Sequence, residues 1–280
     1  MKNFKFLVYP YLIWAFIIIV IPMIMIAVYA FTVKGNDVMT FKFTLDNFKE
    51  FFADAIFLKV LERSLIVALI TTVICIALGY PAAYIIANIA GEKNKFTMVL
   101  LITIPTWINM LVRTYAWLGI LQDNGLVNTI LKALGFPVLK LIHTDFAVIF
   151  GMVYNFIPFM ILQIYTSLTK MDKSYLEAAE DLGANKVQCF LKITLPLSLP
   201  GVISGITLVF LPAVSSFFIP KLLGGGQYVL IGNVIENQFL TAGNWNFGSA
   251  ISLIMAVVMI FLMWLTKKAD KDPAAEKGGV

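Results

Sequence analysis

Six long apolar runs, separated by polar segments, constrain the fold of this chain more than any other feature. Each run is close to the roughly 20 residues that an α-helix needs to cross a lipid bilayer. The runs cover residues 7–31, 64–89, 96–120, 146–168, 195–222 and 247–265. Hydrophobic residues make up 60% of the chain and charged residues 13%, against about 45–50% and about 25% in soluble domains. We therefore predict an all-α polytopic membrane protein with six transmembrane helices in the lipid bilayer.

The first run, residues 7–31, is the one that a secretory signal peptide would also explain. It is well beyond the 7–15 apolar residues of a signal-peptide core, and Pro10 stands near its start. We interpret it as a spanning helix that stays in the protein.

Lysines in the short polar segments predict the orientation of the chain. They gather at the N-terminus, after the second run and in the tail, as Lys2, Lys5, Lys93, Lys95, Lys267, Lys268 and Lys271. By the positive-inside rule these segments are cytoplasmic, so both termini are predicted to be cytoplasmic in a multi-pass protein of the cell (inner) membrane. The net charge of +5 is then a signal of topology, and no nucleic acid is expected as a partner.

The polar segment 172–194, between the fourth and fifth runs, has the pattern of a helical hairpin on the cytoplasmic side. Ser174 and Glu177 have the spacing of a capping box, which predicts a helix start. Gly183 can end that helix in the left-handed conformation, and Asn185 can cap a second helix that runs into Leu195. An ordered hairpin at a membrane surface is typical of a segment that binds a partner.

The same hairpin resembles the signature of permease subunits of ATP-binding-cassette (ABC) importers. The matching positions are Glu177, Ala178, Ala179, Gly183, Ile193, Leu195 and Pro196. The resemblance implies that the hairpin docks in a cleft on the ATPase subunit, where small alanines allow close approach. The alternative is an ordinary amphipathic connector in which Glu177 is only a capping residue.

The resemblance extends over nearly the whole chain and is closest to spermidine/putrescine importer permeases. It is carried by FTLDNF, LGYPAAY, PTWINMLVRTYAW, VYNFIPFM and LIGNVIENQFL. It implies a type I ABC importer permease core at residues 62–266, with the coupling hairpin at 172–194. Residues 1–61 would be an additional N-terminal transmembrane helix and extracytoplasmic segment, and residues 267–280 a cytoplasmic tail.

This family works with other chains, so the resemblance also implies partners. They are an ABC ATPase dimer, a second homologous permease and an extracytoplasmic solute-binding protein. The sequence has no GxxxxGK[ST] phosphate loop, so ATP is expected to be bound by the partner subunit. The chain itself is expected to be a transport subunit, with no enzymatic activity and no cofactor.

Candidates for the translocation path are polar and aromatic residues in the third and fourth runs, because the six runs contain no Asp or Glu. They are Trp107, Asn109, Arg113, Tyr115, Tyr154 and Asn155. Trp and Tyr can hold an ammonium group by cation–π contact, although core packing explains them equally well. Asn side chains at membrane depth either line a path or bridge helices.

Charged residues outside the path complete the set of candidates. Arg113 is expected to have a structural or gating role, paired with Asp123, Asp145 or an acid of a partner subunit. Asp123, Asp145 and Glu236 are candidates for docking the binding protein or steering a cation, with plain solvated loops as the alternative. Trp117 is expected to be an interfacial aromatic anchor.

Other functional classes fit the sequence less well. A stand-alone channel or ion-coupled carrier would more often carry an acid within a span. An intramembrane enzyme needs a catalytic pair at span depth, and the single histidine, His143, lies in a loop. Cys75 and Cys189 lie at different depths, and no metal-ligand spacing exists, so neither a disulfide nor a metal site is expected. Within the importer class, a metal chelate, thiamine or an anion remains an alternative cargo to polyamines.

Overall fold

A computed structural model describes residues 8–33 and 42–269 of this chain, and these are almost entirely helical. Within them, the one β-type pairing is an isolated bridge between Thr32 and Phe43. Lys2, Lys5, Lys271 and most of the predicted tail lie outside the described residues. The described parts of residues 1–61 and 231–260 form one compact unit, and those of residues 62–230 and 261–280 form another. The division into an N-terminal segment, core and tail stays a prediction.

Five of the six predicted spans are confirmed as helices long and apolar enough to cross a membrane. They are Tyr9–Ala30, Ala55–Asn88, Asp145–Lys170, Lys186–Ser215 and Trp245–Thr266. In terms of individual elements, these spans comprise α1 (Val8–Ala15) with a π-helical stretch and α2 (Ile21–Ala30), then α4 (Ala55–Asn88), α8 (Asp145–Lys170), α11 (Leu195–Ser215) and α14 (Trp245–Ala269).

The predicted span over residues 96–120 is present only as a broken pair of helices. It contains α5 (Glu92–Trp107) and α6 (Met110–Leu121), and the chain bends by 90° between Glu92–Trp107 and Met110–Ala133. Pro105 lies in the last turn of α5, and the side chain of Asn109 accepts a hydrogen bond from the backbone N–H of Leu111 (2.8 Å), which caps α6. Because Asn109 satisfies a free backbone donor, the chain starts a new helix there.

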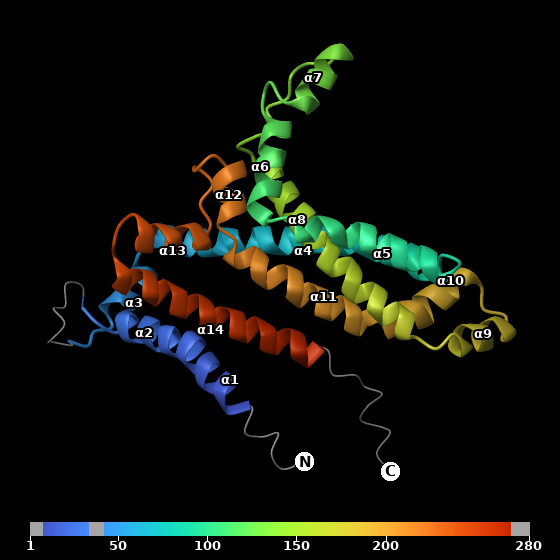
Figure 1. The fold of residues 1–280 in the computed structure, drawn as a ribbon, viewed down its shortest axis with the longest axis horizontal. Coiled ribbons are helices and arrows are strands. Elements are labelled where there is room, and N and C mark those ends of the chain that lie inside the picture. Colours follow the sequence, from blue (N-terminus) through green and yellow to red (C-terminus); the bar gives the residue numbers. More distant parts are fainter. Residues whose placement is uncertain (1–7, 34–41, 270–280) are drawn as a thin grey trace. The chain divides into compact units, whose positions relative to one another are not determined.

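The predicted span over residues 195–222 also has different limits. Its helix ends at Ser215, since Ser216 is extended, and a separate α12 (Phe218–Leu223) follows. A short α7 (Leu126–Ala133) follows α6. Figure 1 shows α6 leaving the end of α5 at a steep angle.

The core of the second unit is the contact between α8 and α11, which depends on glycines one turn apart. A Cβ added at Gly201 would lie 2.4 Å from Ser167 Cβ, and one at Gly205 would lie 2.5 Å from Met160 Sδ. Small residues four apart let membrane helices approach closely. Helix α4 joins this core through the hydrogen bond between the Tyr80 hydroxyl and Ser198 Oγ (2.7 Å).

In the first unit, two asparagines fix the end of the N-terminal helix. The side-chain amide of Asn47, on α3 (Asp46–Ala53), donates to the Ala30 and Thr32 carbonyls at 3.0 Å each. The amide of Asn246 donates to the Tyr29 and Thr32 carbonyls, also at 3.0 Å. These bonds satisfy carbonyls that the end of a helix leaves without partners. The unit also contains α13 (Ile231–Leu240).

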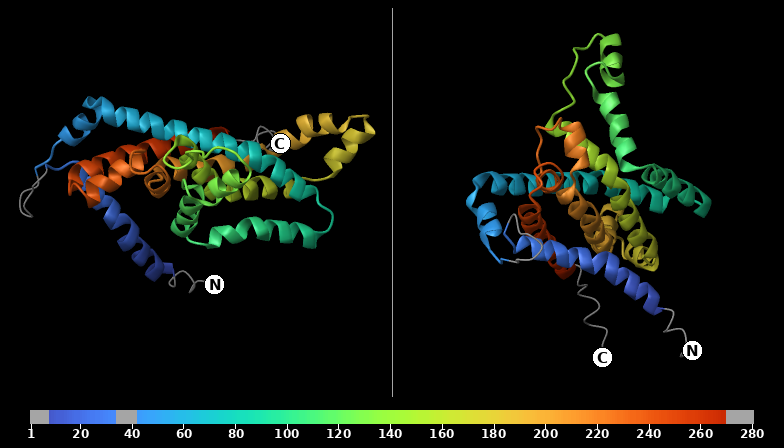
Figure 2. Two further views of the ribbon diagram at one scale, coloured as in Figure 1. Left: turned by 90° about the horizontal axis from the view of Figure 1, so that it is seen from above. Right: turned by 60° about the vertical axis from the view of Figure 1, so that its left-hand side comes forward.

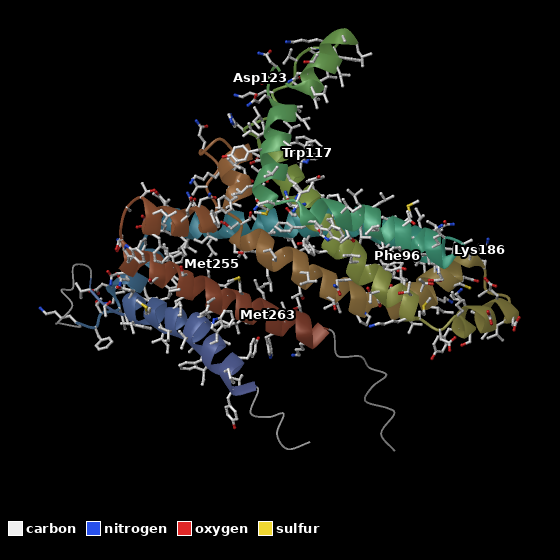
Figure 3. The ribbon with its side chains drawn as sticks, viewed as in Figure 1. Phe96, Trp117, Asp123, Lys186, Met255 and Met263 are labelled. Carbon is white, nitrogen blue, oxygen red and sulfur yellow. The ribbon has the colours of Figure 1, made fainter. Side chains whose placement is uncertain are left out.

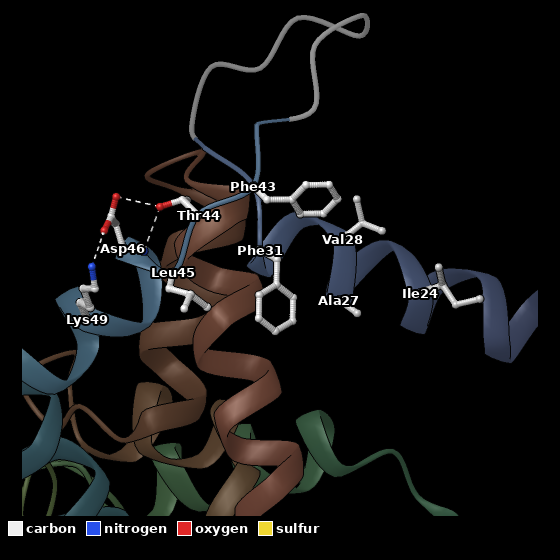
Figure 4. Close-up of a pocket in the computed structure, with 9 residues that line it drawn as sticks. All are labelled: Ile24, Ala27, Val28, Phe31, Phe43, Thr44, Leu45, Asp46 and Lys49. Atoms are coloured by element: carbon white, nitrogen blue, oxygen red, sulfur yellow. Dashed lines mark hydrogen bonds and ion pairs between the residues drawn. The ribbon is translucent and has the colours of Figure 1, made fainter.

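Beside this helix end lies an open apolar pocket of about 590 Å³ with a polar rim (Figure 4). At the rim, Thr44 Oγ1 donates to Asp46 Oδ2 (2.7 Å), and Lys49 Nζ lies 3.3 Å from Asp46 Oδ1. The hydrogen bond from Thr44, followed by that from Lys49 and its charge, holds the pKa of Asp46 below its ordinary value.

Candidate functional site

The predicted helical hairpin at residues 172–194 is present, with a start that differs in detail from the prediction. Helix α9 (Ser174–Asp181) begins at the predicted residue, yet its N-cap is Lys173, without a side-chain hydrogen bond. The capping box of Ser174 and Glu177 is therefore wrong. Instead, Asp172 Oδ1 accepts from the backbone N–H of Ser174 (2.9 Å), and this bond lowers the pKa of Asp172. An acid two residues earlier thus takes the place of the serine cap.

The glycine stop of the hairpin is confirmed. Gly183 has φ +83°, its N–H donates to the Glu180 carbonyl (2.9 Å), and Ala184 N–H donates to the Ala179 carbonyl (3.0 Å). This pair of bonds is a Schellman motif. A Cβ at Gly183 would meet nothing within 4 Å, so the left-handed backbone is the whole reason for glycine there.

The second helix of the hairpin is also capped as predicted, and it does not stop at the membrane. Asn185 and Gln188 form a reciprocal capping box, with both bonds at 2.9 Å. Helix α10 (Lys186–Cys189) then continues through a π-helical stretch, Phe190–Thr194, into α11. Pro196, one of the positions that match the permease signature, lies in the first turn of α11 within this continuous helix. Figures 1 and 2 show α9 and α10 extending beyond the end of α8.

Phe190 fixes the hairpin to the rest of its unit. Its ring packs edge-on against Tyr80 (5.8 Å between centroids) and Tyr84 (5.4 Å), both on α4. Edge-to-face pairs of this kind add about 0.5–1.5 kcal/mol beyond the burial of their area. These aromatic contacts therefore hold the base of the hairpin against α4, in addition to its continuous helical connection to α11.

The hairpin exposes several large apolar side chains among its charged ones. Leu182 is 89% exposed, and Tyr175, Val187 and Leu191 are exposed as well. Of the seven positions that match the permease signature, four are exposed and three are half-buried. The exposed ones are Glu177, Ala178, Gly183 and Pro196, and the half-buried ones are Ala179, Ile193 and Leu195. Glu177, Glu180 and Lys186 contribute to a polar pocket of about 790 Å³. Figure 3 labels Lys186 at the start of α10.

A second site lies at the break between α5 and α6. A pocket of about 470 Å³ there is lined by four of the six path candidates, Trp107, Asn109, Arg113 and Asn155, together with apolar residues of α8 and α11. Trp107 is 72% exposed. Tyr115 is exposed and does not line the pocket. Tyr154 does not line it either, and its ring centroid lies 6.0 Å from the Arg113 guanidinium carbon.

Two of these residues have structural partners. Asn109 caps α6, and the Asn155 amide donates to the Gly151 carbonyl (2.8 Å) while its Oδ1 is buried without a partner. Trp117, expected at an interface, is half-buried and packs edge-on against Phe150 (4.6 Å) and Tyr154 (5.2 Å). Figure 3 labels Trp117 on α6 and Asp123 in the turn beyond it.

The expected pairing of Arg113 with Asp145 is wrong. Asp145 Oδ1 accepts from Arg63 Nη2 (2.9 Å), and the Arg63 guanidinium lies 3.9 Å from the Tyr228 ring centroid. Burial and the Asp145 charge raise the pKa of Tyr228. Arg63 was missed because it stands just before a predicted span, and its partner is 82 residues away.

The remaining charged candidates lie apart from this cluster. Asp123 is exposed in the turn after α6, and among the described residues no ion pair joins it to Arg113. Glu236 lies on α13 in the first unit. No group of three or more His, Cys, Asp or Glu side chains suited to a metal ion occurs in residues 8–33 and 42–269.

Comparisons with known proteins agree with this architecture. The family model for the binding-protein-dependent transport system inner membrane component matches residues 79–272. The spermidine/putrescine transport system permease protein PotB of Haemophilus influenzae is 38% identical over 92% of this chain and 91% of its own length. PotB of Escherichia coli is also 38% identical, over 92% of this chain and 94% of its own length.

A solved structure supports the same fold. It is that of a bacterial ABC transporter involved in the import of the acidic polysaccharide alginate, with a TM-score of 0.80 at 17% identity, over 96% of this chain and 94% of that one. The fold is thus that of an ABC importer permease, and the confirmed spans make the chain a multi-pass inner membrane protein. This chain belongs to the family of binding-protein-dependent transport system inner membrane components.

Proposed function

We propose that this chain is the transmembrane permease subunit of an ATP-driven, binding-protein-dependent importer of polyamines, namely spermidine and putrescine. The observation that carries the proposal is the 38% identity to two PotB proteins over nearly the full length of all three chains. Both relatives are described as spermidine/putrescine transport permeases.

The exposed hairpin is the proposed contact with the ATPase dimer. Its apolar surface at Tyr175, Leu182 and Val187 lies outside the confirmed spans, or at the very start of one, which supports burial against a soluble partner. The capped turns fix the shape of that surface, so that little conformational entropy is lost on docking. In this proposal, ATP is bound by the partner subunit.

The pocket at the helix break is the proposed part of the path for an ammonium group. Trp107 offers an exposed ring face, worth about 0.5–2 kcal/mol for a cation. Asn155 Oδ1 is buried without a donor, and a primary ammonium supplies one.

Two further partners complete the proposed assembly, a second homologous permease and an extracytoplasmic solute-binding protein. Asp123, Asp145 and Glu236 remain the proposed contacts for the binding protein. Asp145 is the weakest of the three for steering a cation, because Arg63 already neutralises its charge.

An anionic solute is the second candidate cargo, because Arg113 lines the pocket and none of the pocket's lining residues is acidic. Uptake of labelled spermidine and putrescine by a strain that lacks this chain decides between the two. Restoration of uptake by the wild-type gene, and not by Gly183→Pro, is the expected result. Unchanged uptake of both compounds without the chain would refute polyamines as the cargo and leave the importer fold standing.

A further inference from the structure

Arg113 is the one charged residue that lines the pocket at the α5–α6 break, and its charge has no counterpart there. Its Nε and Nη1 atoms are buried and have no hydrogen-bond acceptor among the described residues. The side chain lies at the fourth position of α6, directly after the break. Its guanidinium carbon lies 6.0 Å from the ring centroid of Tyr154, at the outer limit of a cation–π contact.

Arg113 is half-buried as a residue, and burial of two guanidinium nitrogens without an acceptor is unfavourable, since no hydrogen bond replaces their hydration. The other polar residues of the pocket, Thr106, Asn109 and Asn155, are neutral. Two of them are already engaged, because Thr106 Oγ1 donates to the Thr103 carbonyl and Asn109 caps α6. These groups therefore leave the charge of Arg113 unbalanced.

Among the described residues, no acid forms an ion pair with Arg113. Asp145 is bound to Arg63, and Asp123 is exposed in the turn beyond the far end of α6. The six apolar runs contain no acid between their ends, so a second copy of this chain also has none to place at mid-span.

We propose that an Asp or Glu carboxylate of a different permease subunit enters this pocket and accepts hydrogen bonds from Arg113. The inference rests on the proposed function in taking a second permease as the neighbour. The pair joins the two subunits beside the path, and it cancels a positive charge that otherwise repels a polycationic cargo. The incoming carboxylate then also lies beside Trp107 and Asn155, where it can attract the ammonium group.

A zero-length cross-link tests the contact. The variant Arg113→Lys keeps the charge and places an amine where the guanidinium was. In the purified complex with the co-expressed second permease, a water-soluble carbodiimide activates carboxyl groups, and attack by an adjacent lysine amine forms an amide with net loss of water. We expect mass spectrometry to find an amide between position 113 and an acidic residue of the second permease. Val112→Lys, at an exposed neighbouring position, is the matched control and is expected to give none.

Function provides a second readout. We expect Arg113→Gln to lower uptake by about tenfold or more, because it leaves the incoming carboxylate without a partner, and Arg113→Lys to lower it less. A cross-link only to Asp123 or Asp145 of this chain, or no cross-link while both permeases are present in the complex, overturns the inference. Loss of a co-purified phospholipid in Arg113→Gln, with no cross-link in Arg113→Lys, assigns the anion to a lipid phosphate and also overturns it. The cross-link needs no cargo, so a failure of polyamine uptake is a separate result.

Discussion

The turn at Gly183 gives the sharpest test of the coupling hairpin, because only the backbone conformation demands glycine there. Its φ is +83°, and a Cβ built at this position meets nothing within 4 Å. The substitution Gly183→Ala thus adds no clash and costs only the left-handed conformation, about 1–2 kcal/mol. Such a cost lowers the equilibrium ratio of molecules with an ordered turn to molecules with an opened turn by a factor of roughly 5–30.

Amide hydrogen exchange measures the opening of the turn, and transport assays measure its consequence for function. We expect the amides of residues 183 and 184 to lose protection by the same factor, and uptake and ATPase stimulation to fall with it. Gly183→Asn is expected to be milder than Gly183→Ala, since asparagine adopts positive φ more readily. Gly183→Pro, whose ring fixes φ near −65°, is expected to abolish the turn.

Gly119 provides a matched control on α6. A Cβ there also meets nothing within 4 Å, and its backbone is helical. Gly119→Ala is therefore expected to be neutral or to stabilise the helix by about 0.5–1 kcal/mol. If Gly183→Ala and Gly183→Asn behaved alike, or if Gly119→Ala reduced transport as much, the explanation by backbone strain would be refuted.

Three further predictions concern packing and charge. Gly201→Ala places a Cβ 2.4 Å from Ser167 Cβ, and we expect about 1–3 kcal/mol of destabilisation as a lower Tm of the purified chain; an unchanged Tm would contradict the close α8–α11 contact. Phe190→Ala is expected to lower uptake more than it lowers Tm, because it frees the hairpin from α4 and leaves the helical core intact; equal losses would indicate general unfolding. The bond to Ser174 lowers the pKa of Asp172 in the folded protein. Its contribution to the free energy of unfolding is therefore present above the ordinary pKa of an aspartate, and it is lost as the pH falls through the lower folded pKa. A pKa of this carboxyl, measured by NMR titration, at or above that of an unfolded peptide would contradict the bond.

The sequence predicted best those features that short-range chemistry decides. Gly183 and Asn185 act through neighbours within three residues, and both roles are confirmed. The capping box of Ser174 and Glu177 failed although it is equally local, because its two backbone donors have other partners. The Ser174 N–H donates to Asp172, and the Glu177 N–H donates to the Lys173 carbonyl. Residue spacing alone does not tell which acceptor each N–H binds.

The sequence did not predict the long-range contacts, for a different reason. The pairing of Arg63 with Asp145 joins residues whose separation along the chain carries no signal of contact. The close approach of α8 to α11 was also unpredicted, although Gly201 and Gly205 have the spacing that allows it. Four path candidates line one pocket. They belong to two predicted spans, and the sequence did not show that these parts of the two spans lie together.

The break between α5 and α6 connects these observations. The apolar run at residues 96–120 continues on both sides of Pro105 and Asn109, so hydropathy alone predicts one span and does not locate the break. A straight helix would have satisfied its own backbone, and breaking it frees polar groups that lipid does not solvate. Irregular backbone at membrane depth is tolerated only where it is buried in protein or lines a cavity. Here the irregular segment at Ile108 and Asn109 lines a pocket that Arg113 also lines. The same residues that break the helix therefore build the pocket, which supports a place for it on the route of the cargo rather than in the passive packing of the bundle.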